Sequence, residues 1–343
     1  MISFEYAQPD QLLDVMTLLA PEEERTMLMG GGTQMLALLK ENLIQPRRIV
    51  SLASVPELRE IKYEGTSLRI GATATLTDLL ESERVRELYP SVIDAVEAVA
   101  SPQIRNLGTV GGQVMRRPDC WYYHRGYGLF GTKTGQSLPL KGDHRDHAIL
   151  GNSGPARFVS SSRLGPVLYS LEAAFVVATA YSNVAEKQPA NVRSPRQAKA
   201  YIRFSGSKLW KLPQSVAETE LAPTSVTLLS HVLLPPRPPT CAYYEVRSRR
   251  GFDQPEASAA VVLDMRDQEV RRCRVVLGHV APIPWLVDVS AAILGKPVNE
   301  ATAEAVGRLA VAGATPLERN KHKVVHAMVA TKRALLMAIA RAR

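Results

Sequence analysis

Two short glycine-rich segments carry the residue types and spacing best suited to chemistry. Gly30-Gly31-Gly32-Thr33 lies between a short apolar strand predicted over 27–29 and a helix predicted over 35–40, which Thr33 could cap. Gly108-Thr109-Val110-Gly111-Gly112-Gln113 follows a helix predicted to end near residue 100, and its Thr109 hydroxyl could reach a phosphate or a sugar. Glycines before a helix leave backbone N–H groups open to an anion, with no side chain in the way. Each loop alone could equally be a simple turn.

Neither loop fits the usual nucleotide fingerprints. The first lacks the G-x-G-x-x-G spacing, and no G-x-x-x-x-G-K-[ST] is present. Two glycine loops far apart in the chain suit a long dinucleotide held between two subdomains, and FAD is such a molecule. No G-x-S-x-G, H-E-x-x-H or conspicuous carboxylate pair is present, so no catalytic residue is expected. A redox protein needs none, because the cofactor carries the chemistry.

Composition narrows the class of protein. The chain has 343 residues, 45% of them hydrophobic, and a formal charge of +9, with Lys and Arg spread along the sequence. Without a basic run or a recognition motif, nucleic-acid binding is not expected, and an acidic partner or a polyanionic cofactor explains the excess as well. The chain has three scattered cysteines, no apolar stretch of membrane-spanning length and no leader pattern. We therefore expect a cytoplasmic protein without a membrane span.

The elements that must position the loops suggest three domains. Residues 1–56 predict a helix over 12–19 and then a strand, glycine turn, helix and strand. Residues 57–234 predict a mixed subdomain with helices over 77–89 and 90–100 and strands over 68–71, 174–178 and 226–234. Within it, the excursion 113–157 lacks periodicity, which suggests an interface or cofactor loop or a disordered insert. Pro235-Pro236-Arg237-Pro238-Pro239 is a stiff linker to residues 235–343, which predict a hairpin of strands 259–265 and 271–280 and helices over 299–311 and 316–341.

Four motifs together resemble one family. Met29-Gly-Gly-Gly-Thr-Gln-Met-Leu, Gln103-Ile-Arg-Asn-Leu-Gly-Thr-Val-Gly-Gly-Gln, Ala281-Pro-Ile-Pro and Thr315-Pro-Leu-Glu-Arg-Asn-Lys-His-Lys-Val are similar to the FAD-binding (medium) subunit of molybdenum hydroxylases. That family includes xanthine dehydrogenase, carbon monoxide dehydrogenase and aldehyde oxidoreductase types. The resemblance covers nearly the whole chain. It implies an α+β fold: a vanillyl-alcohol-oxidase (PCMH) type FAD-binding domain of two α/β subdomains, then a C-terminal domain with a three-stranded antiparallel sheet and helices.

The resemblance also implies site residues. The flavin loops and their neighbours fall on Leu28, Met29, Gly30, Gly31, Gly32, Thr33, Gln34, Met35, Ser101, Ile104, Thr109, Gly111, Gly112, Gln113, Leu164 and Leu221. Neither loop has a His or Cys placed for a covalent link, so FAD is expected to be noncovalent. Two positions depart from the family pattern: Arg163 stands where Asp is expected, and Glu245 where some relatives carry Lys near the flavin ring. Both departures could alter flavin binding or potential.

By the same resemblance, the chain works in a heteromeric complex. A molybdopterin-binding large subunit would hydroxylate an aldehyde or N-heterocycle, a small subunit with two [2Fe–2S] clusters would relay electrons, and FAD would pass them to NAD+, oxygen or a quinone. The alternatives are a self-sufficient flavin reductase of the same fold and a scaffold that has lost FAD. The segment 115–142 combines basic residues with Trp121, Tyr122, Tyr123 and Tyr127, which suggests a surface for the iron–sulfur subunit. A local aromatic core is the other reading.

The remaining candidates for binding a metal ion or an iron–sulfur cluster lack the further ligands that such a site needs. Cys120 resembles the start of a loop that holds a four-iron cluster in some relatives, but such a cluster needs several cysteines and this segment has one. His144 and His147 have no third or fourth ligand within reach in the sequence. No metal site is therefore expected.

Overall fold

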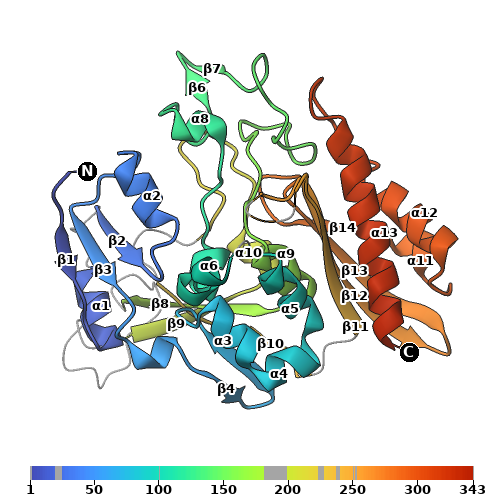
Figure 1. Ribbon diagram of the computed structural model, residues 1–343, viewed down its shortest axis with the longest axis horizontal. Coiled ribbons are helices and arrows are strands. Elements are labelled where there is room, and N and C mark those ends of the chain that lie inside the picture. Colours follow the sequence, from blue (N-terminus) through green and yellow to red (C-terminus); the bar gives the residue numbers. More distant parts are fainter. Residues whose placement is uncertain are drawn as a thin grey trace.

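The computed structural model describes residues 2–19, 25–99, 101–180, 199–222, 228–236, 240–249, 251 and 253–342. In these residues, three larger sheets follow one another along the chain and lie side by side in Figure 1, and a fourth sheet has only two short strands. The predicted proline linker lies partly outside these residues, at 237–239. Within the described residues, no helix is both long and apolar enough to cross a bilayer.

The N-terminal sheet has three parallel strands in the order β1-β3-β2. The predicted strand, glycine turn, helix and strand are present, and β1 adds an edge strand that was not predicted. Leu12, Val15 and Met16 of helix α1 are buried against Val50 of β3, so the helix covers one face of the sheet. The elements are β1 (Glu5–Ala7), α1 (Leu12–Leu18), β2 (Thr26–Met29), α2 (Met35–Lys40) and β3 (Arg48–Ser51).

The central sheet is antiparallel, with five strands in the order β4-β5-β10-β8-β9. Its strands are β4 (Ile61–Glu64), β5 (Ser67–Gly71), β8 (Ala174–Ala180), β9 (Lys199–Phe204) and β10 (Leu228–Leu234). The largest core forms between these strands and the helices that cover them. Those helices are α3 (Leu76–Glu81), α4 (Glu83–Leu88), α5 (Pro90–Glu97), α6 (Pro102–Leu107), α7 (Val110–Val114), α9 (Leu164–Ser170) and α10 (Gly206–Leu209), and the short 3-10 helix η1 (Pro56–Leu58) precedes β4.

The helix predicted over 77–89 is two helices in the structure. Ser82 has an extended backbone, and its hydroxyl accepts a hydrogen bond from Val85 N, so α3 ends and α4 begins at this residue. A serine that caps its own downstream helix interrupts a continuous helical ladder.

The C-terminal sheet has four antiparallel strands, β11-β12-β13-β14, so the expectation of three strands was wrong. The additional strand, β14 (Trp285–Val287), is only three residues long and pairs with β13 directly after Ala281-Pro-Ile-Pro, too short to show a period in the sequence. The predicted hairpin is present as β12 (Ala257–Arg266) and β13 (Glu269–Gly278). Its turn residues, Asp267 and Gln268, both have positive φ, which is typical of a tight hairpin turn.

Helices cover one face of this sheet. They are α11 (Ser290–Ile293), α12 (Glu300–Ala310) and α13 (His322–Ala342), and α13 packs against both β11 (Thr240–Val246) and β12. Helix α13 begins at His322 and not at Pro316 as predicted, because Asn320 and its neighbours make irregular contacts with another part of the chain.

Residues 144–152, called here the inserted segment, leave the central domain and lie within the C-terminal domain. Ile149 N donates to Val280 O at 2.9 Å, and Thr315 N donates to Ile149 O at 2.7 Å. The motif residues around 315–323 secure the rest: Arg319 N donates to the imidazole of His144, Asn320 donates to His147 O, and Lys323 donates to Asp146 O. Part of the motif that resembles the family is therefore used to hold this segment.

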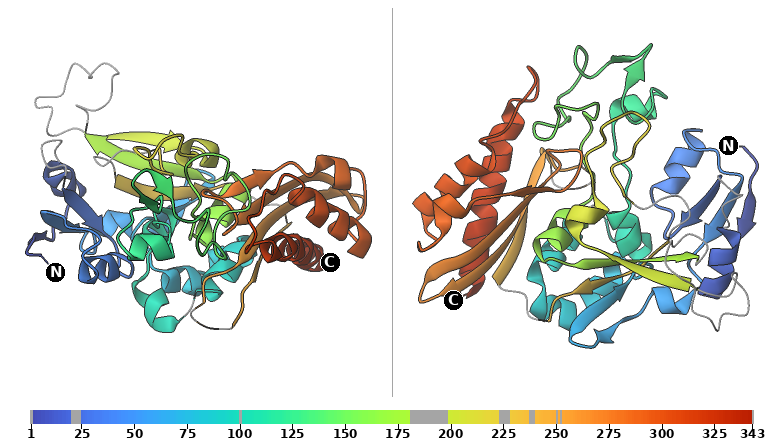
Figure 2. Two further views of the ribbon diagram at one scale, coloured as in Figure 1. Left: turned by 90° about the horizontal axis from the view of Figure 1, so that it is seen from above. Right: turned by 180° about the vertical axis from the view of Figure 1, so that it is seen from behind.

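The excursion contains little regular structure: helix α8 (Trp121–His124) and the small hairpin of β6 (Thr132–Lys133) and β7 (Gln136–Ser137). It has its own small core of Cys120, Tyr122, Phe130, Ala156 and Phe158. In Figure 1 it stands above the sheets, between α2 and the upper end of α13, and Figure 2 shows the same arrangement from above and from behind. The excursion is thus a packed projection in the part of the chain described, and not a disordered insert.

Candidate functional site

The first glycine loop joins β2 to α2. Thr33 does not cap this helix: the capping residue is Gln34, whose side chain makes no cap hydrogen bond. Instead, the Gln34 amide donates to Arg117 O at 2.9 Å and accepts from Arg117 N at 3.1 Å. Among the described residues, no backbone carbonyl accepts a hydrogen bond from the N–H groups of Gly31, Gly32 and Thr33. These three donors are available to an anion.

The second glycine loop is closed on itself. Gly111 N donates to Ala72 O at 2.7 Å, and Gly112 N donates to the Thr109 hydroxyl at 3.1 Å, with Thr109 capping α7. A Cβ atom on Gly111 would lie 2.9 Å from Ala72 O, so glycine allows this close approach of two backbones. The backbone donors of this loop are therefore engaged within the protein, although the Thr109 hydroxyl can still donate its own hydrogen.

The two loops touch. A Cβ atom on Gly31 would lie 1.5 Å from Leu107 O, and one on Gly30 would lie 2.7 Å from the Thr109 hydroxyl. Only glycine fits at position 31, where the obstacle is backbone, and a side chain at position 30 would displace the Thr109 hydroxyl. The sequence prediction that two distant glycine loops act together thus agrees with their spatial arrangement.

Two adjoining cavities follow the line where the loops meet; together they are called the groove. Their volumes are about 460 and 200 Å³. Both are lined by Met27, Leu28, Gly30, Thr109, Gly112, Met115 and Arg117. The larger cavity continues to an apolar end formed by Leu52, Leu221, Leu228 and Leu229.

The groove fits an elongated ligand that is polar at one end and flat and apolar at the other. The hydroxyls of Thr26 and Thr73 line the larger cavity and are buried without a hydrogen-bond partner among the described residues. Such groups are costly unless a ligand or water satisfies them. The available N–H groups of the first loop and the guanidinium of Arg117 suit a negatively charged group, and the leucines suit an aromatic ring. This donor set matches a dinucleotide such as FAD.

The predicted site residues divide into two groups. All eight from Leu28 to Met35, together with Thr109, Gly111, Gly112 and Leu221, line the groove. Four others do not: Ser101 caps α6 by accepting from Ile104 N, Ile104 packs against the central core, Leu164 is buried in that core, and Gln113 is a buried residue of α7. The structure therefore gives Ser101, Ile104 and Leu164 positions that support the site from outside the cavities.

Sequence reasoning missed Thr26, Thr73 and Arg117. Thr73 lies in Gly71-Ala-Thr-Ala-Thr, whose alternating small residues contact the second loop. Arg117 follows that loop and lies 3.5 Å from the buried carboxylate of Glu220, which makes no hydrogen bond through its side chain among the described residues. The pair is a charge contact without hydrogen-bond geometry, so the guanidinium keeps donors for a ligand.

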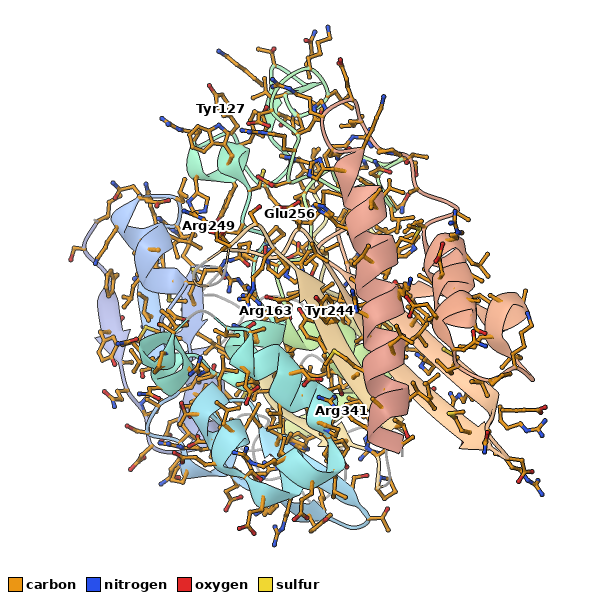
Figure 3. All side chains as sticks on the ribbon, turned by 45° about the vertical axis from the view of Figure 1, so that its right-hand side comes forward. Tyr127, Arg163, Tyr244, Arg249, Glu256 and Arg341 are labelled. Atoms are coloured by element: carbon orange, nitrogen blue, oxygen red, sulfur yellow. The ribbon has the colours of Figure 1, made fainter. Side chains whose placement is uncertain are left out.

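Arg163 and Glu245, the two departures from the family pattern, form a buried ion pair. Their side chains are 4% and 5% exposed, with Arg163 Nε 2.9 Å from a Glu245 oxygen. The Tyr243 hydroxyl donates to the same carboxylate at 2.9 Å, and Arg163 also donates to Asp253 O at 3.0 Å. Burial raises the pKa of Tyr243 well above its usual value, so it stays a donor. Figure 3 shows Arg163 where the central domain meets the C-terminal strands, and neither residue lines the groove.

Cys120 lies 3.3 Å from His147 Nε2, in the wall of a separate cavity of about 300 Å³. Burial raises the pKa of the Cys120 thiol and lowers the pKa of His147 to about 4. The pair is therefore a neutral thiol beside a neutral imidazole, which is the pattern of a structural contact and not of a reactive thiolate.

Comparison with known proteins gives the family. Residues 2–188 match the family model described as "FAD binding domain in molybdopterin dehydrogenase", and residues 242–336 match "CO dehydrogenase flavoprotein C-terminal domain". The aldehyde oxidoreductase FAD-binding subunit of Escherichia coli (strain K12) is 27% identical over 92% of this chain and 90% of its own length. The carbon monoxide dehydrogenase medium chain of Hydrogenophaga pseudoflava is 34% identical, but over only 32% of this chain and 39% of its own length.

Solved structures show the same fold. The quinoline 2-oxidoreductase of Pseudomonas putida 86 aligns with a TM-score of 0.73 at 21% identity, over 99% of this chain and 98% of that one. The carbon monoxide dehydrogenase of Hydrogenophaga pseudoflava aligns with a TM-score of 0.72 at 24% identity, over 99% of both chains. The predicted resemblance is confirmed, and with it a PCMH-type FAD domain of mixed α/β content. This chain belongs to the family of FAD-binding subunits of molybdopterin-dependent dehydrogenases, and it is an oxidoreductase subunit.

Proposed function

We propose that this chain binds FAD noncovalently in the groove between its two glycine loops and serves as the electron-transfer subunit of a molybdenum hydroxylase complex. The observation that carries the proposal is the contact between the loops, which requires glycine at position 31 and which lies beside the cavities of about 460 and 200 Å³. In this proposal, residues 1–56 and 57–234 are the two FAD-binding subdomains, and residues 235–343 form the C-terminal domain.

The residues of the groove have separate tasks. The N–H groups of Gly31, Gly32 and Thr33 bind the diphosphate, whose charge Arg117 offsets. The hydroxyls of Thr109 and Thr73 bind polar atoms along the sugar and ribityl chain. The apolar end, Leu52, Leu221, Leu228 and Leu229, excludes water from a ring. The second loop acts mainly as a wall, because its own N–H groups are engaged.

Bound FAD would supply reversible acceptance and release of electrons. We propose that these electrons come from the [2Fe–2S] clusters of a small partner subunit, reduced in turn by a molybdopterin-binding large subunit, and leave to NAD+, oxygen or a quinone. The relatives' names support this, since they are medium chains or FAD-binding subunits of dehydrogenases and oxidoreductases. The described residues of the groove contribute binding and exclusion of water, with no acid, base or nucleophile placed to act on an organic substrate.

The iron–sulfur subunit is proposed to dock on the excursion. The Trp121 side chain is 60% exposed, with the Arg125 guanidinium stacked 4.3 Å from its ring centroid, and Tyr127 is also exposed (Figure 3). Tyr122, by contrast, belongs to the small core of the excursion, so the sequence prediction that grouped all four aromatics on one surface needs revision. Exposed Arg125, Lys133 and Lys141 give the projection a positive charge that suits an acidic partner.

Reconstitution of this chain with its proposed iron–sulfur partner tests the proposal. The purified chain should hold one FAD, and anaerobic mixing with the reduced iron–sulfur subunit should bleach the visible flavin absorbance. A folded chain that takes up no FAD would support a scaffold and contradict the proposal. A flavoprotein that turns over an organic substrate without partners would support a self-sufficient reductase instead.

A further inference from the structure

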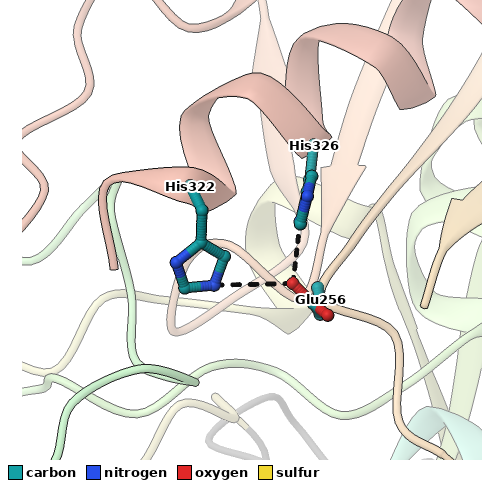
Figure 4. Close-up of side chains that lie close together, drawn as sticks. All are labelled: Glu256, His322 and His326. Carbon is teal, nitrogen blue, oxygen red and sulfur yellow. Dashed lines mark ion pairs between the residues drawn. The ribbon is translucent and has the colours of Figure 1, made fainter. Parts of the chain in front are cut away.

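Three side chains converge where helix α13 of the C-terminal domain begins. His322 and His326 lie one turn apart on the same face of α13, and Glu256, immediately before β12, lies opposite them (Figure 4). One ligand atom from each residue lies within 4.8 Å of the other two. The convergence is produced by the fold, since Glu256 is far from both histidines in the sequence.

The distances suit a transition-metal ion. Glu256 Oε2 lies 2.7 Å from His326 Nδ1 and 3.4 Å from His322 Nε2. Zinc binds nitrogen and carboxylate oxygen at about 2.0–2.2 Å, which places tetrahedral ligands about 3.4 Å apart. Small side-chain rotations would bring these three atoms to that separation. Water would occupy the remaining coordination positions of the ion.

Two further observations favour metal binding by these side chains over a simple ion pair between them. His326 Nδ1 is buried, and its contact with the Glu256 carboxylate, 2.7 Å away, lacks the geometry of a hydrogen bond. The Ser248 hydroxyl donates to the other oxygen, Glu256 Oε1, and so fixes the carboxylate's orientation. An outer hydrogen bond of this kind is typical of carboxylates that bind metal.

The electrostatic surroundings are compatible with a cation. Although burial opposes ionisation, the Ser248 hydrogen bond and the two imidazoles hold the pKa of Glu256 below its usual value. The nearby cation, Lys323, is buried and donates to Asp146 O at 3.1 Å, and the charge of the Glu256 carboxylate acts on it as well. A bound ion would displace the imidazole protons, and the ligand set would then carry one negative charge and two neutral imidazole nitrogens, as in known two-histidine, one-carboxylate sites.

We propose that Glu256, His322 and His326 bind one divalent transition-metal ion, zinc above all, which links the start of β12 to the first turns of α13. The ion has a structural role. It joins the segment that accepts the Arg163 hydrogen bond, through Asp253 O, to the helix that covers the C-terminal sheet. The site lies apart from the groove and does not depend on the proposed flavin function.

The test uses the purified full chain, treated with EDTA and then titrated with ZnCl₂ or CoCl₂. Calorimetry should give one zinc ion per chain, zinc should raise the midpoint of thermal unfolding, and cobalt should give visible absorption bands typical of low coordination number. His326→Ala and Glu256→Gln should each abolish all three signals. Ser248→Ala should raise the Kd about 10-fold, the usual effect of losing an outer hydrogen bond.

The matched control is His124→Ala. His124 also lies between two carboxylates, those of Glu41 and Asp119, but they contact opposite ring nitrogens and cannot converge on one ion. This variant should bind zinc like the parent chain, and circular dichroism and cooperative thermal unfolding should show that all variants are folded. Zinc binding that persists unchanged in His326→Ala and Glu256→Gln would place the ion elsewhere and overturn the assignment. Failure of the parent chain to bind zinc would leave the cluster as an ion pair.

Discussion

Gly31→Ala is the sharpest perturbation of the proposed flavin groove. The added methyl group would lie 1.5 Å from Leu107 O and 2.5 Å from the Leu107 carbonyl carbon. An ordinary carbon–oxygen contact is about 3.3 Å, so the two loops must move apart by about 1.8 Å. The obstacle is backbone at the end of α6, which cannot rotate away as a flexible side chain could.

The cost in FAD binding follows from the donors that the first loop provides. A shift of this size is larger than the tolerance of a hydrogen bond, so at least two of the three N–H contacts from Gly31, Gly32 and Thr33 should be lost. At about 1.5 kcal/mol for each bond to a charged group, binding weakens by about 3 kcal/mol, which raises the Kd roughly 150-fold.

Flavin fluorescence titration of the apoprotein measures this Kd, and thermal unfolding is followed in parallel. Gly307→Ala is the matched control: its methyl group would lie 2.7 Å from Met328 O, between α12 and α13 and away from the groove. It should lower thermal stability and leave the Kd unchanged. If Gly31→Ala binds FAD within threefold of the parent chain, the loops are turns and do not form the site.

Four other predictions concern the cofactor, the partner surface and two buried polar groups. Acid precipitation should release all flavin, and flavin mass retained on the chain would contradict noncovalent binding. Trp121→Ala should weaken pull-down of the iron–sulfur subunit with flavin content unchanged, whereas Tyr122→Ala should mainly lower thermal stability; the opposite pattern would refute the docking surface. Burial lowers the pKa of His147 to about 4, against about 6.5 in the unfolded chain, so the unfolded chain takes up the proton first and stability should fall by up to about 3 kcal/mol as pH drops through that window. Urea unfolding of the parent chain and His147→Gln across this window should show a shallower slope for the variant. Arg163→Ala leaves the buried Glu245 carboxylate with only the Tyr243 hydroxyl and the Arg247 guanidinium, 3.4 Å away, and should cost about 3 kcal/mol in urea unfolding, of which Arg163→Met with Glu245→Leu should recover most.

Local patterns predicted the elements that carry the site. The triple glycine between β2 and α2 and the Gly108–Gln113 loop were both recognised from glycine context and helix position, and they meet in the structure. The β12–β13 hairpin followed from two apolar runs around a polar turn. Such features depend on residues close together in sequence, where periodicity and turn chemistry are informative.

Features that depend on distant residues could not be predicted in the same way. The sequence shows Arg163 and Glu245 only as two departures from a family pattern, and their ion pair forms because α9, which Arg163 precedes, packs against the C-terminal sheet that contains β11. Likewise, Thr73 lines the groove because it follows Ala72 at the end of β5, and the carbonyl of Ala72 accepts the hydrogen bond from Gly111 N of the second loop. The Glu256, His322 and His326 cluster was missed because the two histidines on one helix do not indicate that a carboxylate from a distant part of the sequence lies beside them.

The inserted segment, residues 144–152, limits the modularity of this protein. Its backbone carbonyls accept hydrogen bonds from the side chains of Asn320 and Lys323, which are both almost fully buried. A fragment that begins at residue 240 would therefore lack part of its own core. During synthesis, the inserted segment is made before the strands that it packs against. The C-terminal domain can therefore complete its core only when this segment of the preceding domain packs into it. Grafting this domain between relatives would therefore require the segment to be transferred with it.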